Sequence, residues 1–124
     1  TRYGLRKLIE SRSVDIIQPD VMWCGGLTEL LRISAMAGAY DIPVIPHGSG
    51  AYSYHFVISQ PHCPFCEYLN TSEDCLSFPP VFGNMFENEI LPQNGKIKLT
   101  DDPGWGLKLN RNGLKLNRVF ASTE

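Results

Sequence analysis

The chain alternates amphipathic stretches with short apolar runs. The amphipathic stretches repeat their apolar side chains at the spacing of an α-helix, and the apolar runs are rich in β-branched residues and bounded by serine, proline or glycine, as buried strands are. The predicted order is a helix at 2–11, a strand at 14–18, a helix at 27–40, a strand at 42–46, a helix at 51–60 and a strand at 66–69.

This alternation predicts an α/β fold in which a parallel sheet is covered on both faces by helices. In such folds the chemistry lies at the carboxyl ends of the strands. Asp20 and His47 each lie just past the end of a predicted strand. An ordinary right-handed crossover would place both on one rim of the sheet, next to each other.

A carboxylate that is hydrogen-bonded to one imidazole nitrogen fixes the tautomer and leaves the other nitrogen as a base. Asp20 and His47 could form such a dyad, which suits the removal of a proton from carbon. The alternative is that the two have separate structural roles. Asp20 would then cap the turn before Cys24, and His47 would pack against its neighbours.

Two further positions on the predicted rim could carry chemistry. Glu67 interrupts an otherwise apolar run, so it lies either on the solvent face or at the rim. The glycines around Ser49, in His47-Gly-Ser-Gly50, allow the backbone to approach a ligand closely. This stretch matches neither a phosphate-binding loop nor the Gly-x-Ser-x-Gly of a serine nucleophile.

The four cysteines include the pair Cys63-x-x-Cys66, which could be a redox dithiol or half of a zinc site with His62 and Cys75. The pair enters a predicted strand, whereas a redox dithiol belongs at a helix N-terminus. We therefore interpret these cysteines as incidental. A chain of this size does not need disulfides, so we expect a reduced, cytoplasmic protein.

Composition excludes several classes. The 124 residues are 43% hydrophobic and 19% charged with a net charge of −2, which gives no basic surface for nucleic acid or acidic lipid. No apolar stretch approaches the roughly 18 residues that span a bilayer. The chain begins at Thr1 without a signal-peptide pattern, so we expect it to be processed or incomplete.

The sequence changes character after residue 75. The remainder is rich in proline, glycine and asparagine, and GLKLNR occurs twice, at 106–111 and 113–118. Asn112-Gly113 between the copies predicts a hairpin turn. We expect two parts: an α/β segment at 1–75 and an irregular segment at 76–124.

A resemblance to a known family is carried by VDIIQPDVMWCGGLTELLRISAMAGAYDIPVIPHGSGAYSYHFVISQP and by FCEYL further along. From about Arg2 to Trp105 the chain resembles the acid-sugar dehydratases of the enolase superfamily. The resemblance implies the C-terminal part of a modified TIM (β/α)7β barrel, incomplete in this chain. Residues 1–75 would run from the fifth helix to the eighth strand, and 76–124 would pack on the barrel or on the capping domain.

The resemblance also implies a function. The family is Mg²⁺-dependent and removes water from a sugar acid, such as an aldonate, to give a 2-keto-3-deoxy acid. His47 matches the general base, Asp20 the aspartate of the preceding strand, and Glu67 the acidic residue that contacts the substrate or its enolate. Ser49 would bind substrate. The metal ligands of the family precede Thr1, so we expect none in this chain.

The complete enzyme would be a cytoplasmic lyase of sugar-acid catabolism, a homo-oligomer with neither nucleic acid nor membrane as a partner. We expect the isolated chain to be inactive, because open strand edges and uncovered apolar faces favour aggregation. Two alternatives remain. One is another reaction on the same scaffold, by a different dehydratase, a racemase or a cycloisomerase. The other is a non-catalytic module that binds a partner, or a metal through Cys and His.

Overall fold

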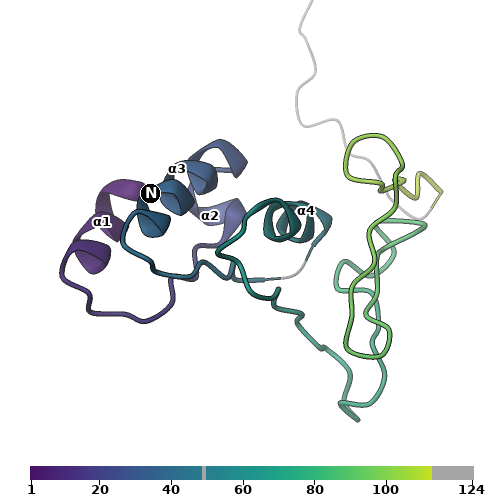
Figure 1. Ribbon diagram of the computed structural model, residues 1–124. Helices are drawn as coiled ribbons and strands as arrows, with labels where there is room; N and C mark the ends of the chain where they lie inside the picture. The colour runs from purple at the N-terminus through teal and green to yellow at the C-terminus, as the bar shows by residue number, and fades with distance from the viewer. Residues whose placement is uncertain (49, 113–124) are drawn as a thin grey trace, which may run out of the picture.

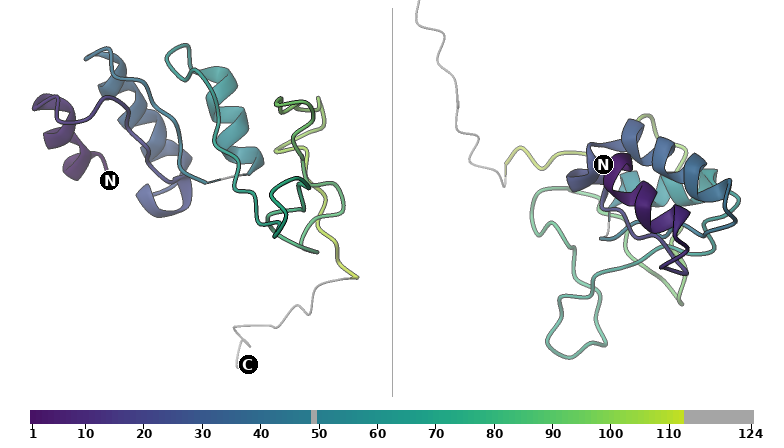
Figure 2. Two further views of the ribbon diagram at one scale, coloured as in Figure 1. Left: turned by 90° about the horizontal axis from the view of Figure 1, so that it is seen from below. Right: turned by 90° about the vertical axis from the view of Figure 1, so that its left-hand side faces the viewer.

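The computed structural model describes residues 1–48 and 50–112. It contains the helices α1 (Arg2–Glu10), α2 (Val21–Cys24), α3 (Leu27–Gly38) and α4 (Ala51–Ser59). These helices gather on one side of the molecule, and the segment that follows them forms an irregular arm on the other (Figure 1). Seen from below, α1, α3 and α4 lie side by side (Figure 2). None of the described helices has the length and apolarity that crossing a membrane requires.

The three predicted helices are confirmed within two residues at each end, and α2 was not predicted. This single turn begins at Asp20, whose side chain accepts hydrogen bonds from the backbone of the first turn, and ends at Gly25, whose φ is +118°. An aspartate N-cap and a left-handed glycine C-cap are standard helix boundaries. Their presence in the sequence was a usable signal for this short helix.

The predicted strands at 14–18 and 42–46 pair in parallel, but only through one bridge, Ile17 with Val44. Ile17 donates its N–H to the Pro43 carbonyl (3.0 Å), and Ile45 donates to the Ile17 carbonyl (2.9 Å). The next bond of the ladder runs from His47 N–H to the Pro19 carbonyl (3.2 Å). Proline has no N–H to return, so the ladder stops short of a full strand.

The third predicted strand, 66–69, is not formed among the described residues. Its segment nevertheless begins beside the second one, because Val44 donates its N–H to the His62 carbonyl (3.3 Å). Further along, the Gly48 N–H goes to the Glu67 side chain instead of a backbone carbonyl. A side chain thus takes the place of a ladder bond, which ends regular pairing there.

The core lies between the helices and the paired segments. Helix α3 turns Leu30, Ile33 and Ala37 inward, and all three are fully buried. Their spacing of three and four residues is the period of an α-helix, so one apolar stripe faces the core. The other members come from α1, α2, the paired segments, α4 and the segment after it: Ile9, Ile17, Val21, Cys24, Ile42, Val44, Phe56 and Cys63.

An ion pair joins the beginnings of α1 and α3. Glu29, which is 8% exposed, accepts the Arg2 backbone N–H (2.8 Å) and pairs with the Arg2 guanidinium. These contacts, led by the backbone hydrogen bond, lower the pKa of Glu29 despite its burial. A buried carboxylate is tolerated here because its charge is compensated.

The arm after residue 75 is held by hydrogen bonds rather than by helices or strands. Glu87 donates its N–H to the Lys108 carbonyl, and Asn110 donates to the Met85 carbonyl, both at 2.9 Å. The first GLKLNR copy therefore pairs with residues 85–87. The second copy lies outside the described residues, as does the second half of the predicted hairpin. The division at residue 75 stays a prediction.

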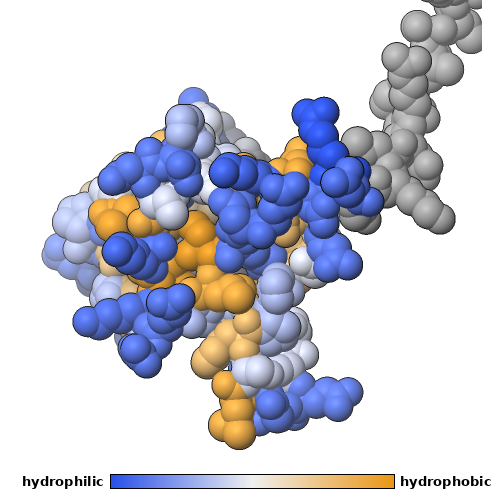
Figure 3. Space-filling model, turned by 90° about the vertical axis from the view of Figure 1, so that its right-hand side faces the viewer, coloured by the Kyte–Doolittle hydropathy of each residue, from blue (hydrophilic) through white to orange (hydrophobic). Residues whose placement is uncertain are grey.

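Apolar side chains remain on the surface of the face that carries this arm (Figure 3). Ile58 is 75% exposed and Leu76 is 83% exposed. Exposed apolar surface of this kind is typical of protein contact faces.

We expect Leu30→Ala in the native protein to lower the free energy of unfolding by about 2–5 kcal/mol, because it leaves a cavity in the core. Leu31→Ala is the matched control on the next, exposed position of α3. It should change stability by no more than about 0.5 kcal/mol. Urea unfolding measures both, and equal losses would contradict the assignment of the buried face.

Candidate functional site

The ends of the two paired segments lie together at one rim. The last bond of the ladder joins His47 N–H to the carbonyl of Pro19, the residue before Asp20. His47 and Asp20 therefore leave the sheet at the same end, as the sequence predicted. Glu67 reaches this rim from the third segment, and the structure so brings together the three ionisable residues singled out from the sequence.

His47 and Glu67 form the central contact of the site. Glu67 Oε2 lies 2.9 Å from His47 Nδ1 and accepts the Gly48 N–H at 2.5 Å. A carboxylate only accepts, so in the neutral ring Nδ1 carries the proton and Nε2 keeps its lone pair. About half of the His47 side chain is exposed, at 53%. The arrangement presents a base at an open rim with its partner behind it.

Asp20 has the capping role that was left open as an alternative. Its Oδ1 accepts the N–H groups of Met22 (2.7 Å) and Trp23 (3.2 Å) at the start of α2. Among residues 1–48 and 50–112, no hydrogen bond joins Asp20 to His47; the Nδ1 position of the ring is taken by Glu67. Asp20 still faces the same loop, since its Oδ2 lies 3.7 Å from where a Cβ on Gly48 would be. The Asp20–His47 dyad stays a prediction.

The loop after His47 depends on glycine. Gly48 has a φ of +84°, which side-chain-bearing residues rarely adopt, and its N–H is the one that Glu67 binds. Ser49, the predicted substrate-binding residue, lies outside the described residues, so its role stays a prediction. The contact of Glu67 with this loop was not foreseen, because nothing in the local pattern around residue 67 indicates which distant side chain it meets.

The structure gives no support to either of the chemical roles considered for the cysteine pair in the described residues. All four cysteines are free. Burial raises the pKa of the Cys63 thiol to about 11 and also raises that of Cys66, so neither is a ready thiolate. The described residues hold no group of three His, Cys, Asp or Glu side chains that could bind a metal ion. The zinc interpretation therefore has no support in the described part of the chain.

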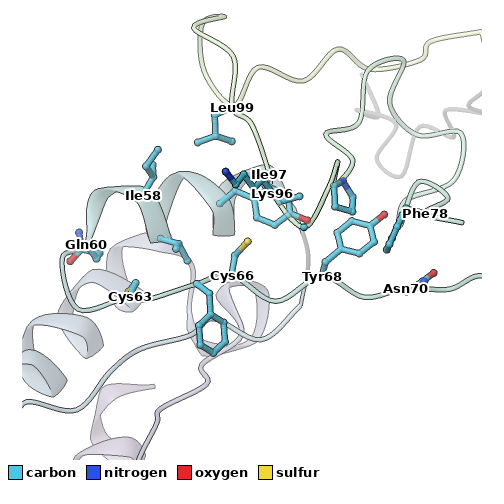
Figure 4. A pocket seen from close by; sticks show the side chains of 15 residues that line it. Ile58, Gln60, Cys63, Cys66, Tyr68, Asn70, Phe78, Lys96, Ile97 and Leu99 are labelled. Carbon is cyan, nitrogen blue, oxygen red and sulfur yellow. The ribbon is translucent and has the colours of Figure 1, made fainter. Parts of the chain in front are cut away.

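Both cysteines line a mainly apolar cavity of about 700 Å³ instead. It lies between α4 and the arm, where Ile58, Tyr68 and Leu99 contribute to its wall and Cys66 points into it (Figure 4). None of the three rim residues lines this cavity. The ionisable side chains of the rim and this open cavity are therefore separate features of the described residues.

Comparison with known proteins identifies the family. Residues 1–113 match the family described as "Enolase C-terminal domain-like", and the chain belongs to it. The expected fold class, the C-terminal part of an enolase-superfamily barrel, is thereby confirmed. The barrel of such enzymes closes around eight strands, of which this chain carries the last part.

The individual similarities are more specific. The chain is 48% identical over 110 residues to an L-rhamnonate dehydratase of Saccharopolyspora erythraea, covering 89% of this chain and 28% of that protein. It is 58% identical to the crystal structure of L-rhamnonate dehydratase from Gibberella zeae, with a TM-score of 0.85, covering 90% of this chain and 29% of that one. The same enzyme has been solved in complex with Mg.

A more distant structure is a mandelate racemase/muconate lactonizing enzyme from a marine actinobacterium. It is 33% identical with a TM-score of 0.76, and the match covers 90% of this chain and 31% of that one. The chain thus spans just under a third of the length of the proteins it matches. The resemblance to acid-sugar dehydratases is confirmed, and the individual similarities point to the L-rhamnonate dehydratases among them.

Asp20→Ala in the native protein should lower the free energy of unfolding by about 1 kcal/mol, because α2 loses its N-cap. Asp20→Asn keeps a capping oxygen, so its free energy of unfolding should stay close to that of the natural protein. Asp15→Ala, an exposed aspartate in the preceding segment, is the control for loss of a charge. Thermal unfolding measures all three, and equal stability of the Ala and Asn variants would contradict the capping role.

Proposed function

We propose that the protein containing this chain dehydrates a sugar acid, with L-rhamnonate as the substrate to test first. The observation that carries the proposal is the His47–Glu67 pair at the rim of a chain 58% identical to an L-rhamnonate dehydratase. A histidine with one nitrogen held by a carboxylate is suited to remove a proton from carbon. The proposal concerns the whole protein, since this chain matches less than a third of such enzymes.

His47 would act first as base and then as acid. Nε2 takes the proton from the carbon next to the substrate carboxylate, and the electron pair left behind forms a double bond to the neighbouring carbon. The hydroxyl on that neighbour leaves, and the same proton, returned by His47, completes a water molecule. The resulting enol tautomerises to a 2-keto-3-deoxy acid, so the net change is the loss of water.

Glu67 supports this role through two contacts. By accepting from Nδ1 it holds the ring with Nε2 outward, and by accepting from the Gly48 N–H it fixes the loop that carries the ring. Asp20 faces the same loop, with its Oδ2 3.7 Å from where a Cβ on Gly48 would be. Ser49 would contact the substrate, as the family resemblance predicts.

The described residues do not fit a Mg²⁺ site, because they hold no group of three potential ligands. The Mg²⁺ expected from the resemblance, and present in the Gibberella zeae complex, would be bound by residues outside this chain. A bound Mg²⁺ makes the C–H beside a carboxylate more acidic. This chain would supply the acid–base side chains only.

A racemase or cycloisomerase on the same scaffold is the alternative in the same class. Sequence identity favours the dehydratase: the chain is 58% identical to the L-rhamnonate dehydratase and 33% identical to the racemase-type structure. A non-catalytic interaction module would instead need this chain to occur alone. The homo-oligomer, the cytoplasmic location and the absence of nucleic-acid and membrane partners stay predictions.

The mass of the native protein is the first measurement. We expect an antibody against residues 92–104 to detect a protein far heavier than the 13.9 kDa of this chain. That protein should turn over L-rhamnonate only when Mg²⁺ is supplied, with a panel of other aldonates as the comparison. A native mass of 13.9 kDa would overturn the proposed function. A heavier protein that prefers another aldonate would overturn the proposed substrate.

His47→Asn should lower kcat by about 10²- to 10⁴-fold, the contribution of a general base. Mg²⁺ binding should be unchanged, because the family resemblance places the metal ligands before Thr1. The control is His62→Asn, which removes an imidazole that contacts Ser34 in α3 instead of the rim. Undiminished turnover by His47→Asn would exclude it as the base.

Parallel kinetics of Glu67→Gln and Asp20→Asn distinguish the two carboxylates as partners of His47. Glu67→Gln should lower kcat more, because it alters the contact seen at Nδ1. A larger loss for Asp20→Asn would favour the dyad predicted from the sequence over the pair seen in the structure.

A further inference from the structure

Tyr52 lies at the start of α4, directly after the loop that carries His47. Its ring folds back over the backbone of Gly50. A Cβ added to Gly50 would lie 2.8 Å from Tyr52 Cζ and 2.9 Å from Cε1, closer than carbon atoms approach without displacement. The ring thus occupies the space that glycine leaves open, and its hydroxyl oxygen lies 3.1 Å from the same position.

The other side of the loop faces Asp20. Its Oδ2 lies 3.7 Å from where a Cβ on Gly48 would be. Burial, and then the negative charge of Asp20, raise the pKa of Tyr52, so the phenol stays neutral and close enough to sense that carboxylate. Asp20 and Tyr52 therefore flank the two glycines of one short loop.

The loop is held at both ends. At its start, the His47 N–H is bound by the Pro19 carbonyl and the Gly48 N–H by Glu67. At its end, the Gly50 carbonyl accepts the N–H groups of Ser53 (3.0 Å) and Tyr54 (3.1 Å) in the first turn of α4. The Tyr52 ring packs against Gly50, the residue whose carbonyl accepts these two hydrogen bonds.

We infer that Tyr52 is a positioning residue for His47: its ring, seated in the space left by Gly50, holds Gly50 in place three residues after the proposed base. The inference rests on the proposed function for its kinetic consequence and on the packing alone for its structural one. This role needs no hydrogen bond from the hydroxyl, because it depends on the packing of the ring alone.

The alternative is that Tyr52 only packs against the core. It does contact the core cluster, as does Tyr40, which lies just past the C-terminal end of α3. Tyr40 therefore serves as the matched control: it is a partly buried tyrosine on the same core, remote from the rim. A purely structural role predicts that the two tyrosines behave alike when truncated.

The experiment uses the native full-length protein, with kcat expressed per folded molecule and the ring ¹⁵N resonances of His47 followed by NMR. Tyr52→Ala should lower kcat by about 10- to 100-fold, because small displacements of a catalytic group carry losses of that size. It should also shift the His47 resonances. Tyr52→Phe keeps the ring and should stay within about twofold of the natural kcat. Tyr40→Ala should lower stability without moving the His47 resonances.

A double-mutant cycle tests whether the Tyr52 ring acts through its contact with Gly50. Gly50→Ala should lower kcat in the natural background, and its fold loss should be at least about threefold smaller in the Tyr52→Ala background, where the clash is absent. The strain from the φ of Gly50 is common to both backgrounds and cancels. Gly4→Ala, in α1 with nothing within 4 Å of the added carbon, is the control.

Either of two results would overturn the inference. The first is that Tyr52→Ala leaves both kcat and the His47 resonances unchanged while it lowers stability. The second is that Gly50→Ala has the same effect in both backgrounds. If the natural protein shows no dehydratase activity at all, the proposed function fails. The His47 resonances, and a stability cycle on the same variants, still decide the role of Tyr52.

Discussion

The parallel pairing of residues 17–19 with residues 43–47 is the constraint on which the site depends. Three backbone hydrogen bonds carry it, and the last one joins His47 to Pro19. Because the segments run in the same direction, their carboxyl ends meet, and the ionisable residues that follow each segment lie at one rim. The proline that ends the ladder also frees the chain to turn, into α2 after Asp20 and into the glycine loop after His47.

Where the backbone ladder ends, a side chain accepts the next N–H group. Glu67 takes the Gly48 N–H where a third strand would have offered a carbonyl, and with the same oxygen it contacts His47 Nδ1. One carboxylate thus closes the sheet edge and orients the imidazole. This coupling makes the position of His47 sensitive to the third segment, although residues 66–69 form no strand in the part of the chain that the structure describes.

We propose that the chain carries the acid–base half of a site that the complete protein builds from a larger barrel. Acid–base side chains are present at the rim, and the described residues offer no cluster of metal ligands. Apolar side chains such as Ile58 and Leu76 remain exposed on the face of the arm. Both features agree with a chain that spans less than a third of the enzymes it resembles.

The sequence by itself determined the helices, the order of the segments and the strand ends at which Asp20 and His47 lie. These follow from local periodicity and from the residues that end helices and strands, which act over a few positions. The α2 boundaries were also local, in Asp20 and Gly25, although they were not used. Only the tertiary structure decided that Glu67 meets His47 and that the Tyr52 ring rests on Gly50. Such contacts depend on how close the packed segments approach and where each side chain points, which a linear pattern does not contain.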